Sequence, residues 1–268
     1  MKVMLLAAGR GERMGPLTAD LPKPLLSLGP ETLIERHLRR LADAGFREIV
    51  INLSYRGGQI RSAIGDTTPR GQTVAYSQEG EPPLETAGGI VHALPLLGDG
   101  PFLVVSTDVV TDHDFRALRT LGADFGRVAD LAADPAADPV AGEFPPSRKP
   151  GAGVSGLLVL VPNPPHHPDG DFGLTADGRL RMPHGTPDTA PPRYTFSGIA
   201  VLRPALFRGL APGIRPLRDV LRPAVRRGEL LGEVYDGLWR DVGTPERLAE
   251  VRALMKTRRL QGSQEAAN

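Results

Sequence analysis

The sequence predicts a Rossmann-like α/β fold, with a mostly parallel central sheet flanked by helices. Apolar runs of strand length alternate along the chain with segments of helical periodicity, which is typical of βαβ units. The first apolar run, residues 3–6, passes directly into a glycine-rich segment, as a buried strand does when its carboxyl end opens toward a ligand. We therefore expect a single domain over residues 1–260.

The segment after the first strand has the composition of a phosphate-binding loop. Gly9 and Gly11 let the backbone approach a ligand closely, and successive N–H groups in such a turn form a concave anion site. Arg13 and Lys23 add positive charge for phosphate oxygens. The P-loop pattern is missing, and the dinucleotide pattern would need a third glycine and a helix directly behind it, which the following prolines disfavour. The loop therefore suits a nucleoside triphosphate.

The remaining elements follow in alternation. Helices are expected at 33–44, 59–64, 114–121 and 217–227, and from the glycines near 88 through 94; strands are expected at 48–52, 73–76, 102–106, 157–161 and 194–202. Thr244, Pro245 and Glu246 mark the start of a last helix. Residues 122–155 hold few large apolar side chains, so we expect a mobile insertion there, and residues 261–268 read as a polar tail that frays.

Two aspartates are candidate metal ligands. Asp108 follows the buried run at 102–106, and an acidic side chain at the carboxyl end of a parallel strand lies where α/β sheets bind ligands. A helix cap or turn aspartate is the alternative, and it is the better interpretation for Asp112. Asp241 lies just before the last helix. Mg²⁺ accepts one or two carboxylates together with phosphate and water oxygens, so this pair suits that ion.

Composition excludes several classes of function. The 268 residues carry a formal charge of +1, from 32 basic and 31 acidic side chains, so no global field favours nucleic acid or an anionic membrane. The absence of cysteine excludes disulfides, thiolate nucleophiles and cysteine-based zinc sites. The first strand follows Met1 almost directly, with no leader pattern. We expect a cytoplasmic enzyme without nucleic-acid or membrane partners, and its oligomeric state cannot be read from the sequence.

Three strings resemble one enzyme family. Leu-Ala-Ala-Gly-x-Gly-x-Arg-Met, followed by Pro-Leu-Thr and Pro-Lys-Pro, resembles the signature of the sugar-1-phosphate nucleotidylyltransferases, which make NDP-sugars from a nucleoside triphosphate and a sugar phosphate. Leu-x-Thr-x-Gly at 84–88 resembles the segment that meets the base edge in that family. Trp-x-Asp-Val-Gly-Thr at 239–244 resembles its second metal motif. The resemblance covers roughly residues 1–121 and 156–256.

The resemblance implies the nucleotide-diphospho-sugar transferase fold and a set of site residues. Arg13 would steady the leaving pyrophosphate, Lys23 the reacting phosphates, and Asp108 and Asp241 would hold Mg²⁺. The implied nucleotide-binding residues are Leu6, Ala7, Ala8, Gly9, Gly11, Glu79, Thr86, Gly88 and Asp108, and the implied sugar-binding residues are Gly170, Asp171, Ser197 and Gly198.

The substrate is indicated by two further strings. Asn-Pro-x-His-His-Pro-x-Gly-Asp-Phe at 163–172 and Phe-Ser-Gly-Ile at 196–199 resemble bacterial N-acetylmuramate-1-phosphate uridylyltransferases. They favour UTP with N-acetylmuramate 1-phosphate, a step of peptidoglycan recycling. The alternatives are a mannose-1-phosphate guanylyltransferase or a glucose-1-phosphate thymidylyl- or uridylyltransferase. A hypothesis of another class, a catalytically silent nucleotide-sugar sensor, would not require the complete catalytic set.

Overall fold

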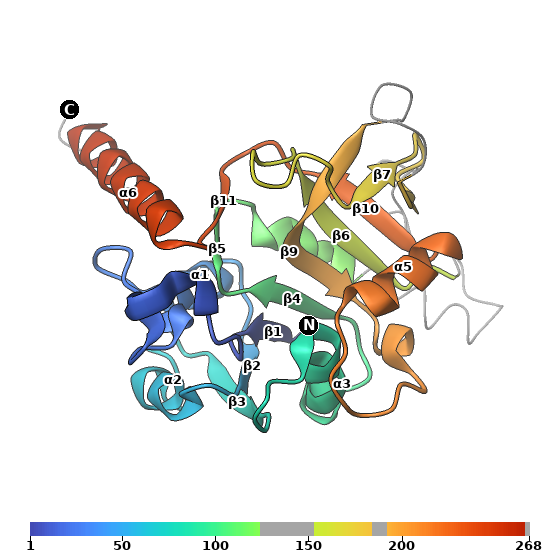
Figure 1. The fold of residues 1–268 in the computed structure, drawn as a ribbon, viewed down its shortest axis with the longest axis horizontal. Coiled ribbons are helices and arrows are strands. Elements are labelled where there is room, and N and C mark those ends of the chain that lie inside the picture. The colour runs from blue at the N-terminus through green and yellow to red at the C-terminus, as the bar shows by residue number, and fades with distance from the viewer. Residues whose placement is uncertain (124–152, 184–191, 266–268) are drawn as a thin grey trace.

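The structure is a computed structural model that describes residues 1–123, 153–183 and 192–265 (Figure 1). The expected insertion at 122–155 lies outside the described residues apart from its two ends. Within the described ranges, helices lie on both faces of a central sheet (Figure 1). The predicted α/β architecture is therefore confirmed.

The central sheet runs in the order β10-β6-β9-β4-β1-β2-β3. Its strands are β1 (Val3–Leu6), β2 (Glu48–Leu53), β3 (Thr73–Gln78), β4 (Phe102–Ser106), β6 (Gly156–Val161), β9 (Arg193–Leu202) and β10 (Leu230–Val234). The neighbours from β4 to β3 are parallel, as are β6 and β10, whereas β9 is antiparallel to both β4 and β6. Leu6 is in register with both Asn52 and Ser106, so β1, β2 and β4 end side by side.

Alternating residues of the sheet pack against different helices. Val3 and Leu5 belong to the core that contains α1 (Leu33–Asp43), α2 (Gly57–Ile64) and the helix at residues 115–123. Met4 belongs to the core on the other face, with α3 (Glu85–Leu97) and α5 (Arg218–Arg226). A strand covered on both faces is expected to be a continuous apolar run, as residues 3–6 are.

The first helix shows why its sequence folds as predicted. Ile34, Leu38 and Leu41 are buried on one face. Its amino end carries a capping box, in which the Thr32 hydroxyl accepts from the Glu35 N–H at 3.3 Å and the Glu35 carboxylate accepts from the Thr32 N–H at 2.7 Å. Gly45 follows the helix with φ of 85°, a conformation that glycine adopts without strain. The spacing of the buried apolar residues, the capping box and the glycine after the last turn therefore all agree with a helix over this segment.

Several short elements were not predicted. They are β5 (Val109–Thr111), β7 (Phe172–Leu174), β8 (Leu180–Arg181), β10, β11 (Trp239–Asp241) and the 3₁₀ segments η1 (Glu12–Thr18), η2 (Lys23–Leu25) and η4 (Pro204–Phe207). β5 and β11 form an antiparallel ribbon of their own, in which Asp241 is paired with Val109. The Val242 N–H donates to the Asp108 carbonyl at 2.7 Å. This ribbon brings the end of β11 next to the end of β4.

Two predictions near the carboxyl-terminal helix are corrected. The helix α6 spans Pro245–Glu265, so helical structure continues past residue 261, where a frayed tail was expected. Asp112 does not cap the helix at 115–123. Its carboxylate accepts from the Leu238 N–H at 2.9 Å and pairs with Arg258 at 3.0 Å, whereas Asp114 accepts from the Arg116 N–H at 3.0 Å. The residue at the start of this helix is therefore Asp114, two positions after the predicted Asp112.

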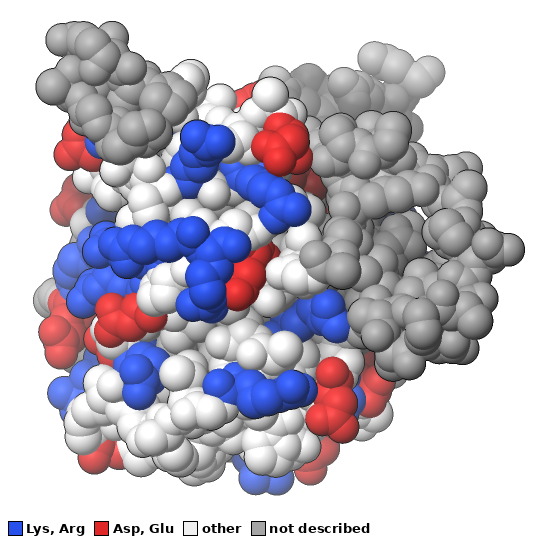
Figure 2. All heavy atoms as spheres, turned by 90° about the vertical axis from the view of Figure 1, so that its right-hand side faces the viewer, with Lys and Arg blue, Asp and Glu red and all other residues white. Residues whose placement is uncertain are grey.

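The side of the molecule that carries α5 shows mixed charge (Figure 2). Lys and Arg side chains gather there in several groups, with acidic and uncharged side chains among them (Figure 2). On α5, Arg218, Arg222 and Arg226 are exposed, and Val220 and Leu221 are buried against the sheet. The outer face of this helix is therefore basic. Among the helices of the described ranges, none has the combination of length and apolarity needed to cross a bilayer.

Candidate functional site

The carboxyl ends of β1, β2 and β4 open onto a cavity of about 790 Å³. The predicted residues Leu6, Ala7, Ala8, Gly9, Gly11, Arg13, Lys23, Glu79, Thr86 and Asp108 line it, together with Arg10, Glu12, Pro24, Asn52, Glu81, Pro82, Pro83, Glu85, Ser106, Thr107 and Gly243. All but one of the predicted nucleotide-binding residues, and both predicted catalytic residues, therefore surround one space. Gly88 is the exception.

The loop after β1 presents unused hydrogen-bond donors to this cavity. No described residue accepts from the N–H groups of Ala8, Gly9, Arg10 or Gly11. Arg13 likewise makes no hydrogen bond or ion pair with any described side chain or carbonyl. Four free backbone donors beside an unpaired guanidinium form a site for the oxygens of a phosphate chain.

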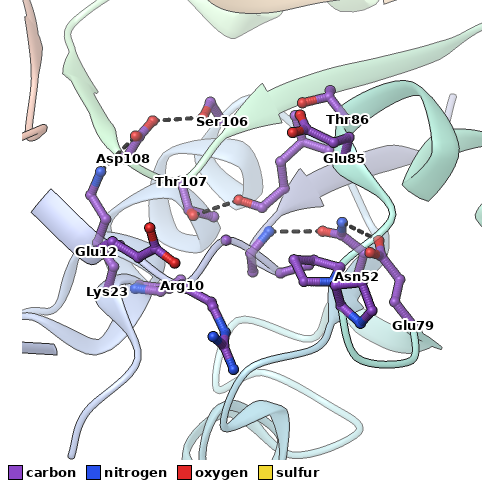
Figure 3. Close-up of a pocket in the computed structure, with 18 of the residues that line it drawn as sticks. Arg10, Glu12, Lys23, Asn52, Glu79, Glu85, Thr86, Ser106, Thr107 and Asp108 are labelled. Carbon is purple, nitrogen blue, oxygen red and sulfur yellow. Dashed lines mark hydrogen bonds and ion pairs between the residues drawn. The ribbon is translucent and has the colours of Figure 1, made fainter. Parts of the chain in front are cut away.

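Asn52 and Glu79 fix the start of that loop through side-chain hydrogen bonds. The Ala7 N–H donates to Asn52 Oδ1 at 2.7 Å, and Asn52 Nδ2 donates to Glu79 Oε1 at 2.7 Å. The other oxygen of Glu79 accepts from the Leu84 N–H at 2.8 Å, just before α3. Figure 3 shows Asn52 and Glu79 side by side on one wall of the pocket. This network connects the phosphate loop to the segment predicted to meet the base.

Lys23 and Asp108 lie on the other side of the pocket (Figure 3). Lys23 Nζ is 2.6 Å from Asp108 Oδ2, and the Ser106 hydroxyl donates to Oδ1 at 2.6 Å. Burial alone would raise the pKa of Asp108, but the charge and hydrogen bond of Lys23, the Ser106 bond and the charge of Arg13 together hold this pKa below its ordinary value. Asp108 is therefore a carboxylate, available to a cation.

Asp241 lies next to the cavity and does not line it, although Gly243 does. Its position follows from the β5–β11 ribbon, which sets it opposite Val109. Its carboxylate contacts Arg247 through one oxygen and lies 3.1 Å from His166 Nε2 through the other. The described residues contain no group of three or more His, Cys, Asp or Glu that could hold a metal by themselves. The two predicted ligands thus lie on neighbouring strand ends, each paired with a basic side chain.

Gly88 packs closely against the segment at residues 213–215, and its predicted contact with the nucleotide stays a prediction. A Cβ at this position would lie 2.2 Å from the Gly213 carbonyl oxygen, and the Gly88 N–H donates to the Arg215 carbonyl at 3.1 Å. Gly89 makes room for the buried network, since a Cβ there would lie 2.4 Å from Glu79 Oε1. The glycines of α3 therefore allow close packing, and Glu85 and Thr86 are the residues of this segment that line the cavity.

The predicted sugar-binding residues lie outside the cavity lining. Asp171 accepts from the Phe196 N–H at 2.8 Å and lies 3.2 Å from His167, contacts that fix the loop at 163–172 to β9. Ser197 is buried, and its carbonyl accepts from Trp239 Nε1 at 2.9 Å.

The two predicted sugar-binding glycines have positive φ. Gly170 has φ of 61°, and a Cβ there would lie 2.6 Å from Asn163 Oδ1. Gly198 has φ of 82°, and its Cβ would lie 3.0 Å from the Cβ of Ser106, so it is next to the cavity wall. Contacts of these four residues with a sugar stay a prediction.

Sequence analysis missed three cavity residues with distinct roles. Asn52 and Ser106 are the last or nearly last residues of buried strands, and a polar residue at that place is the signal that could have identified them. Glu85 has φ of 60°, which is uncommon for a residue other than glycine, and its side chain makes no hydrogen bond or ion pair with a described residue. Figure 3 shows Glu85 and Thr86 together at the start of α3.

Comparison with known proteins finds similarity to nucleotidyltransferases. A family model described as nucleotidyl transferase matches residues 2–129. The chain is 46% identical over 255 residues to the N-acetylmuramate alpha-1-phosphate uridylyltransferase of Neisseria meningitidis serogroup B, covering 95% of this chain and 98% of that protein. It is 28% identical to the mannose-1-phosphate guanyltransferase of Aspergillus oryzae over 92% of this chain and 62% of that protein.

The fold has solved counterparts. The structure of a UDP-glucose pyrophosphorylase complexed with UDP-glucose superposes with a TM-score of 0.69 at 17% identity, covering 96% of this chain and 98% of that one. At this identity the likeness concerns the fold alone.

Proposed function

This chain belongs to the nucleotidyl transferase family, and from that premise we propose that it joins uridine triphosphate to N-acetylmuramate 1-phosphate, giving UDP-N-acetylmuramate and pyrophosphate. The single observation that carries the proposal is the meeting of a loop of free N–H donors, Arg13 and Lys23 with Asp108 at the ends of three parallel strands. Such an arrangement neutralises and orients a chain of phosphates, which is what nucleotidyl transfer requires.

The proposed reaction is a single displacement at the α-phosphorus. A phosphate oxygen of the sugar 1-phosphate forms the new bond, the bond from the α-phosphorus to the β-bridging oxygen breaks, and pyrophosphate leaves with that electron pair. Arg13 and the N–H groups of residues 8–11 would hold the leaving oxygens, and Lys23 the reacting phosphates. Loss of one such charged contact typically costs about 100-fold or more in rate.

A divalent cation is expected at Asp108 and Asp241, and Mg²⁺ is our assignment. The fit rests on two observations: each carboxylate lies against a cationic side chain, and the β5–β11 ribbon together with the Val242 N–H bond to the Asp108 carbonyl makes the two backbones neighbours. Mg²⁺ takes few protein ligands and completes its shell with phosphate and water oxygens, so two carboxylates suit it. When bound, it would neutralise charge on the phosphates.

The choice of substrate rests on similarity and on the two strings that sequence analysis singled out. Identity is higher to the uridylyltransferase of N. meningitidis than to the fungal guanyltransferase, which makes mannose 1-phosphate with GTP the second candidate. We assign Glu79 and Thr86 to the nucleotide, and Gly170, Asp171, Ser197 and Gly198 to the sugar. The proposed product belongs to peptidoglycan recycling in the cytoplasm, and residues 1–260 would act as one domain.

A grid of four nucleoside triphosphates against several sugar 1-phosphates, followed by pyrophosphate release, tests the proposal. We expect kcat/KM to be highest for UTP with N-acetylmuramate 1-phosphate. Asp108→Asn and Asp241→Asn should lose most turnover while remaining folded, whereas Asp99→Asn, at an exposed residue outside the cavity lining, serves as the control. A preference for GTP and mannose 1-phosphate would assign the second candidate. Release of no pyrophosphate with any pair would favour the nucleotide-sugar sensor.

A further inference from the structure

Asp241 is held by two basic side chains from distant parts of the chain. Arg247, in the first turn of α6, contacts Asp241 Oδ2 through Nη1. His166, from the loop after β6, lies 3.1 Å from Asp241 Oδ1 and 3.0 Å from Arg247 Nη1. The side chains of Arg247 and Asp241 are each 20% exposed, so the pair is largely shielded from water.

The backbone around this pair is built to permit it. The Arg247 N–H donates to the Thr244 hydroxyl at 3.4 Å, which places Arg247 in the first turn of the helix. Side chains in a helix point back toward its amino end, so this guanidinium is directed over the preceding strand. A Cβ on Gly243 would lie 2.8 Å from Asp241 Oδ2 and 3.0 Å from Arg247 Nη1, so a side chain at this position would displace the ends of both.

An arginine at this helix position is electrostatically unfavourable by itself. The amino end of a helix carries partial positive charge and favours acidic side chains, as Glu246 illustrates. A cation in the first turn therefore needs a compensating partner, and that partner is Asp241. The pair is thus a specific charge contact.

The other carboxylate of the proposed metal site is paired in the same way. Lys23 Nζ lies 2.6 Å from Asp108 Oδ2. The carboxylates of Asp108 and Asp241 and the cationic groups of Lys23 and Arg247 carry no net charge together, so a free divalent ion meets no excess of negative charge there. A triphosphate changes this balance, because it brings its own negative charge and offers new acceptors to the basic side chains.

We propose that Arg247 is a positioning residue that keeps Asp241 charge-paired until a metal–nucleotide complex arrives, so that the protein takes up its divalent cation with the triphosphate and not before it. The inference rests on the proposed function for the identity of the metal ligands. It predicts that removing the Arg247 charge makes the empty site attractive to a free cation.

The test is binding of Mn²⁺ alone, measured from the electron paramagnetic resonance signal of the free ion, without nucleotide. Arg247→Met keeps an unbranched chain but removes the charge. This variant should bind Mn²⁺ at least about tenfold more tightly than the wild type, which corresponds to about 1.4 kcal/mol of binding free energy. Arg247→Lys restores a cation and should stay within about threefold of the wild type. Lys256→Met removes the same charge from an exposed position of α6 that makes no ion pair with a described residue, and it should leave Mn²⁺ affinity unchanged.

The outcomes separate this inference from the proposed function. Arg247→Met combined with Asp241→Asn should return Mn²⁺ affinity to the weak wild-type level. When a non-hydrolysable α,β-imido analogue of UTP is present, the difference in Mn²⁺ affinity between the wild type and Arg247→Met should become smaller. Unchanged or weaker Mn²⁺ binding in folded Arg247→Met, or equal tightening in Lys256→Met, would overturn the inference. If Asp241→Asn binds Mn²⁺ with the analogue as well as the wild type does, the metal assignment itself fails.

Discussion

Replacing Asn52 by alanine should weaken both the fold and the phosphate loop. Asn52 is 4% exposed, and its side chain bonds two groups at 2.7 Å, the Ala7 N–H and the carboxylate of Glu79, a residue that is also 4% exposed. Leaving a buried polar group without its partner costs about 1–3 kcal/mol, and more for a charged group. The free energy of unfolding should therefore fall by about 3–5 kcal/mol.

The same change should reduce activity through the position of the loop. Asn52 fixes the N–H of Ala7, immediately before the free N–H groups of residues 8–11, so its loss displaces the donors proposed for the triphosphate. A displacement of about 1 Å near reacting groups can lower the rate about 100-fold, and we expect a fall in kcat/KM of that order.

Urea unfolding and steady-state pyrophosphate release measure these two effects, and a double-mutant cycle isolates their cause. Asn52→Ala with Glu79→Ala removes both partners, so its loss in stability should be smaller than the sum of the two single losses by at least about 1 kcal/mol. Additive losses, or an Asn52→Ala variant within about 1 kcal/mol and twofold in kcat/KM of the wild type, would refute the account of this network.

Three further predictions concern single positions. His37 is buried, and burial lowers its pKa to about 4. As pH falls below 6.5, His37 therefore takes up a proton in the unfolded state before it does so in the folded state, and the folded state loses stability. Between pH 7 and 4.5 the free energy of unfolding, measured in urea, should fall by roughly 2.5 kcal/mol more for the wild type than for His37→Gln. Glu85→Gly removes a strained positive φ and should raise the unfolding free energy by about 1 kcal/mol; no gain contradicts the strain. Gly88→Ala should lower the melting temperature through a backbone clash of about 2 kcal/mol, whereas Gly80→Ala, with open space around it, should not.

The parts of the fold that the sequence predicts are those whose signal is local. The run at residues 3–6 is buried on both faces, so its apolar character appears without a partner, and the helix at 33–43 carries periodicity and both end signals. Strands of three residues such as β5 and β11 have no such signal, because their pairing depends on a contact between residues more than 120 positions apart. Asp112 was misassigned for the same reason, since its partners lie near residues 238 and 258.

The residues of the candidate site likewise divide into those with a local sequence signal and those placed only by long-range contacts. The phosphate loop could be predicted to form one site, because its residues follow one another closely in the sequence and line one cavity: Gly9, Gly11, Arg13 and Lys23. Asn52 serves the site through tertiary bonds to Ala7 and Glu79, which only the register of β1 against β2 reveals. Arg247 looks like one more basic residue of a surface helix until the fold places it on Asp241.

The stereochemical course at the α-phosphorus tests the central claim most directly. If an oxygen of the sugar phosphate attacks the α-phosphorus itself, with the protein only holding charge and geometry, then the Sp isomer of UTP carrying sulfur on the α-phosphate should give a UDP-sugar thioate with inverted configuration. Phosphorus NMR of the product, with N-acetylmuramate 1-phosphate as acceptor, measures this. Inversion is the predicted result, and retention would contradict the account, because it requires two displacements and a covalent nucleotidyl intermediate on a protein side chain.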